Sequence, residues 1–309
     1  MMGHKGLFLV LVLIGTGWGL TQPLTKLAVS TGHGQFGLIF WQQVIMVSVL
    51  GAAMLVTGRG LPRDRGSLVA YGVIAMVGTI LPNSASYRAA AHLPAGVMSI
   101  LLSLIPMLAF PVALMLGIER FRWARLGGLG FGLAAVLLLV VPEASLPDPQ
   151  MVPWVGVALV AGVAYAFEGN FVARWGTGKA DAIQTIFGAS LVGAFIALPL
   201  MMGSGQWIDL STGLGTPEWA LILSSLVHAV VYASYVWLVG RAGPVFAVQC
   251  SYIVTLSGVL WAMLLLTESY SPFIWSALGL MLLGLSLVQP KPKAALDAIA
   301  AMGETTEKT

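Results

Sequence analysis

Ten apolar stretches, each long enough to cross a bilayer, fill almost the whole of this chain. A bilayer core of roughly 30 Å needs about 20 apolar residues in helical form, and a backbone without water must satisfy its own hydrogen bonds. With 58% hydrophobic and 9% charged residues, little sequence remains for a soluble domain. The sequence therefore predicts an all-α membrane protein with ten transmembrane helices, at residues 6–28, 36–57, 67–87, 92–117, 125–142, 152–173, 182–203, 217–239, 244–267 and 272–289.

The basic residues lie almost entirely in alternate gaps between these stretches. If the N-terminus is cytoplasmic, 13 of the 15 Lys and Arg residues lie on the cytoplasmic side, and only Lys26 and Arg88 lie on the other. By the positive-inside rule, both termini are therefore expected in the cytoplasm. The net charge of +3 comes from these loop residues, so it does not indicate a nucleic-acid partner.

The chain also repeats itself after about 150 residues. Pro94 opens the fourth span and Glu119 closes it, as Pro244 opens the ninth span and Glu268 closes it. Five spans per copy is an odd number, so the second copy must enter the membrane from the opposite side. We expect two inverted five-helix repeats, at residues 1–146 and 147–290, followed by a cytoplasmic tail at 291–309.

The first span carries a further mark. Trp18-Gly19, with Lys26 at the end of the span, resembles the opening of the EamA family in the drug/metabolite transporter superfamily. The proline-led fourth and ninth spans resemble the two tandem domains of that family, and the resemblance covers residues 6–289. It implies a multi-pass carrier in a bacterial inner membrane, often an exporter, with a central cavity lined by spans 1, 3, 4, 6, 8 and 9. In the second repeat Tyr165-Ala166 stands in place of Trp18-Gly19, and the family pattern does not account for Glu168.

Polar side chains within the spans are the candidates for a binding site, because facing lipid is costly for them. Those on the cavity-lining spans are predicted to bind substrate: Trp18, Gln22, Asn83, Ser99, Ser103, Tyr165, Glu168, His228, Tyr232 and Tyr252. Alternatively, a serine bonds its own helix backbone, and a tyrosine near a helix end belongs to the interfacial belt. The second, fifth, seventh and tenth spans carry few polar residues at mid-depth, apart from Gln42, Gln43 and Ser48 early in the second and Ser190 in the seventh. This suits a packing or lipid-facing role for those spans.

Two of these residues are ionisable and deep. An apolar setting favours the neutral forms of the Glu168 carboxyl and the His228 imidazole, so both are predicted to take part in proton coupling. If they meet across the cavity, Glu168 alternates between a proton and a substrate cation, with His228 as its hydrogen-bond partner. Alternatively, Glu168 pairs statically with His228, Lys26 or Arg174 and only holds helices together.

No pattern of an enzyme is present. The sequence has no metal-ligand cluster, no phosphate-binding glycine loop and no paired carboxylates, so we expect no enzyme activity, cofactor or metal. The function predicted is proton-coupled export of small organic metabolites, such as amino acids or related amines, by alternating access. The alternative is an uncoupled facilitator or a channel for small amphipathic solutes. The expected partners are this solute and the lipid bilayer, and the chain is expected to be a monomer or weak dimer, with Gly128 and Gly132 serving packing within the chain.

Overall fold

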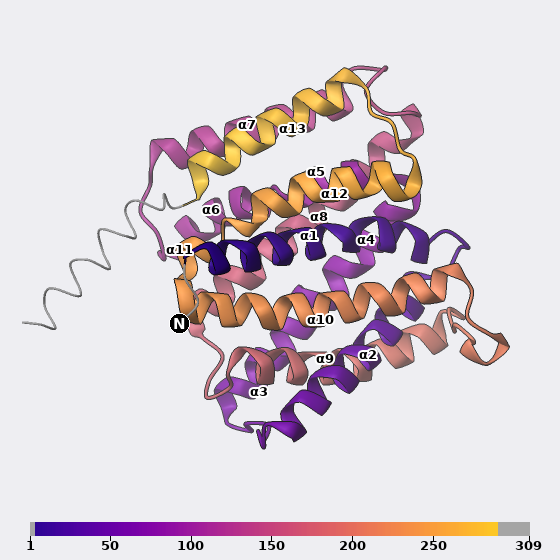
Figure 1. Cartoon of the computed structure of the whole chain (residues 1–309), viewed down its shortest axis with the longest axis vertical. Coiled ribbons are helices and arrows are strands. Elements are labelled where there is room, and N and C mark those ends of the chain that lie inside the picture. The colour runs from indigo at the N-terminus through magenta and orange to yellow at the C-terminus, as the bar shows by residue number, and fades with distance from the viewer. Residues whose placement is uncertain (1–3, 290–309) are drawn as a thin grey trace, which may run out of the picture.

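The protein, seen in a computed structural model that describes residues 4–289, is a bundle of helices lying side by side (Figure 1). Within that range it contains no strand, as the predicted fold class requires. Seven of the ten expected spans are single helices: α1 (His4–Ala28), α2 (Gln35–Val56), α7 (Trp123–Val140), α8 (Val152–Trp175), α9 (Ala182–Gly203), α10 (Thr216–Ala242) and α13 (Pro272–Val288). The predicted tail at 291–309 lies outside the described residues.

The other three spans are interrupted helices. The third consists of α3 (Arg65–Val73), a π-helical segment η1 (Ile74–Ile80) and α4 (Leu81–His92); the fourth consists of α5 (Ala95–Leu102) and α6 (Ile105–Met115); the ninth consists of α11 (Pro244–Ala247) and α12 (Cys250–Leu266). Short 3₁₀ turns, η2 (Pro149–Met151) and η3 (Leu210–Thr212), lie in the loops. Within the described chain, nine helical segments have the length and apolar character to cross a membrane, and α13 is a shorter apolar helix at the tenth predicted position.

Proline explains the boundary between the third and fourth spans. The residue before a proline is pushed out of the helical region, and Leu93 is extended before Pro94. The third span therefore runs on to His92 and the fourth begins at Ala95, rather than at the predicted residues 87 and 92.

The packing of the helices follows the inverted repeat. The first repeat contains α1–α7 and the second α8–α13, and the last spans of the two repeats, α7 and α13, pack together, as do the second spans, α2 and α9. The first span α1 packs on α10 and α12 of the second repeat. Its counterpart α8 packs in the same way on α4, α5 and α6 of the first (Figure 1).

The bundle has two ends, which we call the N-terminal face, where α1 begins, and the opposite face, where α1 ends. On each face a loop of the first repeat contacts a loop of the second repeat. On the N-terminal face Arg59 forms an ion pair with Asp181 at 3.0 Å. On the opposite face the Gln206 side chain accepts a hydrogen bond from the Phe36 amide at 2.8 Å. His33 lies 2.6 Å from Glu218 beside it.

Two charged side chains stabilise the turn between α4 and α5 on the opposite face. Lys26 Nζ donates to the carbonyls of Ala90 and Ala91 at 2.8 and 3.1 Å, near the end of α4. The Glu268 carboxylate accepts from the amides of Ala95 and Gly96 at 2.8 and 3.2 Å, at the start of α5. Helix ends leave these backbone groups without partners, and each receives here the charge that its dipole favours.

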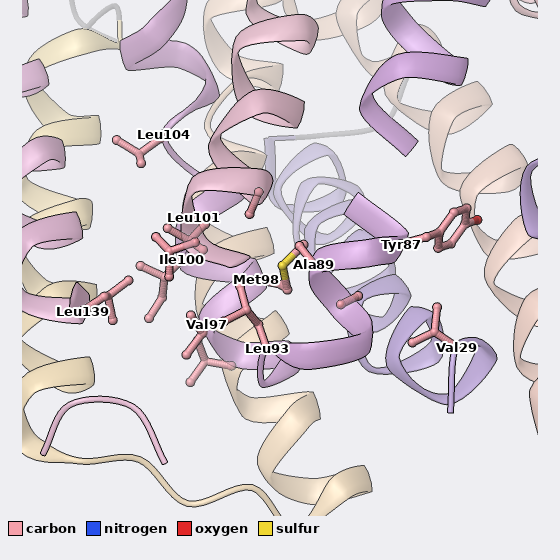
Figure 2. Packing of buried hydrophobic residues seen from close by; sticks show 14 of the residues in the cluster. Val29, Tyr87, Ala89, Leu93, Val97, Met98, Ile100, Leu101, Leu104 and Leu139 are labelled. Atoms are coloured by element: carbon pink, nitrogen blue, oxygen red, sulfur yellow. The ribbon is translucent and has the colours of Figure 1, made fainter. Parts of the chain in front are cut away.

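Apolar packing surrounds the same turn. Leu93 and Val97 are fully buried there, next to Met98 and Leu101 (Figure 2). The turn therefore combines a dry apolar core with two charged caps. This makes it a firmly held part of the opposite face.

Among the described residues, the N-terminal face lacks the equivalent caps. Glu119, the counterpart of Glu268, forms an ion pair with Arg125 at the start of α7 instead of reaching the ninth span. That span opens with α11, a helix of only four residues. In addition, α8 has no packing against α10 or α12 comparable with that of α1 against α4 and α5.

The small residues of α7 pack within the chain. A side chain at Gly128 would collide with Val288 and with the Gly284 backbone of α13, and one at Gly132 would collide with Leu104. Both glycines thus permit close contacts between helices of one chain.

Candidate functional site

A hydrogen-bonded group that we call the amide cluster joins both repeats near the middle of the bundle. The Tyr165 hydroxyl of α8 donates to Asn83 Oδ1 of α4 at 2.6 Å. Asn83 Nδ2 donates to Gln42 Oε1 of α2 at 2.9 Å, and the Tyr87 hydroxyl donates to the same oxygen at 3.1 Å. Asn83 lies in the first turn of α4, three residues after the π-helical segment ends at Ile80.

A second group, the aromatic cluster, joins α1 to α10. Trp18 lies 6.0 Å from the ring of His228 and 5.4 Å from that of Tyr235, and His228 stacks on Tyr232 at 6.4 Å. Trp18 Nε1 donates to His228 Nδ1 at 3.2 Å. Because Nδ1 accepts this bond, the imidazole is neutral and carries its proton on Nε2.

Glu168 lies between the two clusters. Its carboxyl is close enough to interact electrostatically with Tyr165 of the amide cluster and with Tyr232 of the aromatic cluster. It faces Gly78 of the π-helical segment, where a Cβ atom would lie only 2.7 Å from the carboxyl carbon of Glu168. Glycine at position 78 is thus what leaves room for the acid.

No ion pair neutralises this carboxyl within residues 4–289. The three salt bridges there involve other acids, so the static pairs with His228, Lys26 or Arg174 are not formed. Within the same residues no hydrogen bond joins Glu168 to His228, whose Nδ1 accepts from Trp18. The half-buried carboxyl is therefore available to a proton or to a ligand.

The remaining predicted site residues take no part in the hydrogen bonds and ring contacts of these clusters. Ser99 donates to the carbonyl of Ala95 and Ser103 to that of Ile100, so both hydroxyls bond their own helix. Gln22 is half-buried in α1, one turn before Lys26. Tyr252 packs against the largest apolar cluster. The binding roles of these four residues stay predictions.

Sequence reasoning missed Gln42. Its helix was assigned to packing, yet its side chain accepts two hydrogen bonds in the amide cluster. The available signal was the pair Gln42-Gln43 in an otherwise apolar span, because an amide in lipid needs a partner. Gly78 was also missed, since its role depends on the approach of α8.

Comparison with known proteins agrees with this architecture. The EamA-like transporter family model matches residues 4–141 and 152–289, one match for each repeat. The chain belongs to the EamA-like transporter family. It is therefore a multi-pass membrane protein of a family of transporters, as its sequence predicted.

A solved crystal structure, described only as that of a protein, resembles this EamA-like chain. It aligns with 90% of this chain and 97% of its own, at 21% sequence identity and a TM-score of 0.60. At that identity the likeness shows the fold alone. No curated protein matches the chain.

Proposed function

We propose that this protein is a secondary transporter that exports small organic metabolites, such as amino acids or related amines, in exchange for protons. The observation that carries the proposal is the unpaired Glu168 carboxyl between the two clusters. An ionised carboxylate inside a membrane protein is costly without a partner, so it takes up a proton or a cation. A group that binds either one couples their movements in opposite directions.

The proton role falls to Glu168 rather than His228. A protonated imidazole has a hydrogen on both nitrogens and cannot accept the bond that Trp18 donates. His228 would have to break that bond before carrying a proton. His228 better suits the positioning of the aromatic rings, and its part in proton coupling stays a prediction.

Alternating access is supported by the unequal packing of equivalent helices. Two inverted repeats permit two arrangements, in each of which one end of the bundle is closed. In the arrangement described here, α1 contacts α4 and α5, whereas α8 lacks equivalent packing against α10 and α12. We assign this arrangement to the state that is closed at the opposite face.

The direction of transport rests on the charge distribution. Arg63 and Lys179 lie on the N-terminal face, together with most of the described basic residues. We infer that this face is cytoplasmic in a bacterial inner membrane. The state closed at the opposite face then receives its solute from the cytoplasm.

The coupling is tested by Glu168→Gln in proteoliposomes, with a substrate found by a metabolite-resistance screen in cells that overproduce the chain. Glutamine keeps the volume but cannot ionise, so we expect the variant to lose accumulation driven by a pH gradient and to keep solute exchange. Glu143→Gln, which changes an exposed acid in the loop after α7, is the matched control. If Glu168→Gln accumulates solute as the parent does, with the same pH profile, Glu168 is structural and does not carry the coupling. If the parent itself does not accumulate solute in a pH gradient, the protein is an uncoupled facilitator. If flux does not saturate, it is a channel.

A further inference from the structure

We propose that the site around Glu168 takes organic ammonium cations and discriminates against zwitterionic amino acids. The inference rests on the proposed transport function and narrows its substrate class. It is carried by the surroundings of Glu168, an acid without a basic partner that packs against Gly78 and interacts electrostatically with Tyr165 and Tyr232.

The acceptors suit an ammonium group. Neither the Glu168 carboxyl nor the Tyr232 hydroxyl has a hydrogen-bond partner within the described chain, and the two groups interact electrostatically. An ammonium group carries three donors on one positive charge. Its donors match the carboxylate and the phenol oxygen as acceptors, and its positive charge neutralises the acid.

The aromatic cluster suits the rest of such a molecule. The indole of Trp18 and the phenol rings of Tyr232 and Tyr235 present faces whose quadrupole attracts an organic cation. Their apolar edges also accept an alkyl or aryl chain. The neutral His228 between them adds no positive charge to repel the ligand.

A carboxylate on the ligand would find no basic side chain paired with Glu168 among residues 4–289. Lys26, the basic residue of α1 nearest to Trp18, is bonded to two carbonyls at the end of α4 and interacts with Glu268. An amino acid would thus place its own carboxylate beside Glu168 without compensation. Like charges at short distance in a poorly solvated setting are strongly unfavourable.

The interrupted helices do not replace the missing cation. At the break in the fourth span, the amides of Met107 and Leu108 both return to the Leu104 carbonyl. At the break in the ninth, the amides of Ser251 and Tyr252 return to the preceding turn. These breaks are tight turns, and the amides named are already occupied, so they are not free to bind a carboxylate.

A proton competes with the ammonium for Glu168, and few other groups take part. Tyr165 on its own helix and Tyr232 on α10 face it. Among the elements packed on α8, the segments α5, α6 and η1 carry no ionisable side chain. Tyr87 of α4 belongs to the amide cluster and interacts electrostatically with Tyr165. The remaining ionisable groups on α4, α7 and α8 lie toward the ends of their spans: Arg88, His92, Arg125 and Arg174.

A flux assay is unsuitable for these probes, because uncharged amines cross bilayers unaided. The test is therefore equilibrium binding to the purified full-length protein in detergent. The probes are two pairs that differ by one carboxylate, phenethylamine with phenylalanine and butylamine with norvaline. Thermal unfolding is followed at pH 8 as each probe is titrated. We expect each amine to stabilise the protein at a concentration at least about tenfold below the one that its amino acid needs. The difference arises because the carboxylate of the amino acid would be buried without a partner.

Two variants and one change of pH complete the design. Glu168→Gln should lose the preference for the amine, and Glu143→Gln should keep it. Lowering the pH should weaken amine binding to the parent, because the proton competes for the carboxyl. Equal or tighter binding of the amino acids, or the same preference in Glu168→Gln, would overturn the assignment while leaving transport intact. Absence of saturable flux for any solute in the proteoliposome assay would instead remove the proposed function.

Discussion

The two ends of the bundle are built from equivalent segments, yet they are held together differently. On the opposite face Glu268 binds the first amides of α5, and Lys26 binds the last carbonyls of α4. On the N-terminal face the equivalent acid, Glu119, is occupied by Arg125. An inverted repeat thus places equivalent acids at both ends of the bundle. Which end is closed depends on the groups that these acids bind.

Local geometry explains part of this difference. Thr267 adopts the left-handed conformation (φ 54°) at the end of α12, directly before Glu268. Tyr270 donates to the Glu268 carboxylate at 2.6 Å, and a side chain at Gly96 would collide with this hydroxyl. The acid is therefore held in place by its own loop. Glu119 instead lies next to a cation on α7, which keeps it away from the ninth span.

The largest expected effect concerns which end faces the cytoplasm. In a Cys250→Ser background, Asp148→Cys on the opposite face should react with an impermeant thiol reagent added outside intact cells. Arg63→Cys on the N-terminal face should react only after the membrane is opened, because the charge distribution retains that face inside. Reversed labelling would invert the assignment of the two faces and the direction of export.

A smaller effect is expected from the acid on each face. Glu268→Gln replaces the carboxylate that accepts from the first two amides of α5 with a neutral group. This weakens the stabilisation of the closed turn by about 1–2 kcal/mol. The ratio of the state closed at the opposite face to the state open there should fall about 5- to 30-fold. The labelling rate of Gln22→Cys, one turn before Lys26, measures this change. Glu119→Gln is the control and should leave that rate unchanged; equal rates in the two variants would show that the caps do not distinguish the faces.

The smallest effect is expected from Lys26. Its ammonium group binds neutral carbonyls, and the contribution of a cation at a helix end is about 0.3–1 kcal/mol. Lys26→Met should therefore raise the labelling of Gln22→Cys only about two- to fivefold. Arg174→Met near the end of α8 should have no effect, because within the described chain this arginine holds no helix end. A larger change in Lys26→Met than in Glu268→Gln would reverse the order of the two caps.

Most of the fold was predictable because hydrophobic length fixes a membrane helix almost by itself. The predicted and observed limits of the seventh span coincide at residues 182–203. The prolines also carried usable information, since Pro94 predicts an end to the preceding helix. The π-helical segment at Ile74–Ile80 was not predictable, because its sequence differs in no obvious way from an ordinary apolar helix.

The candidate site was predicted in part. Trp18, Asn83, Tyr165 and Tyr232 were chosen because polar groups avoid lipid, and the structure brings them into the two clusters. A hydroxyl such as that of Ser99 also avoids lipid by bonding its own helix backbone. Avoidance of lipid therefore cannot distinguish a residue of the site from a serine that bonds its own helix.

The number of spans, the inverted repeat and the family could all be predicted from the sequence, because each depends on hydrophobic length, on charge or on motifs read along the chain. Three features became visible only in the folded chain: Glu168 has no ion pair among residues 4–289, Gln42 belongs to the amide cluster, and Glu268 binds a helix start while Glu119 does not. These facts concern partners more than a hundred residues apart, or from separate helices. Such partners are selected by packing in three dimensions, and packing leaves no periodic trace in the sequence.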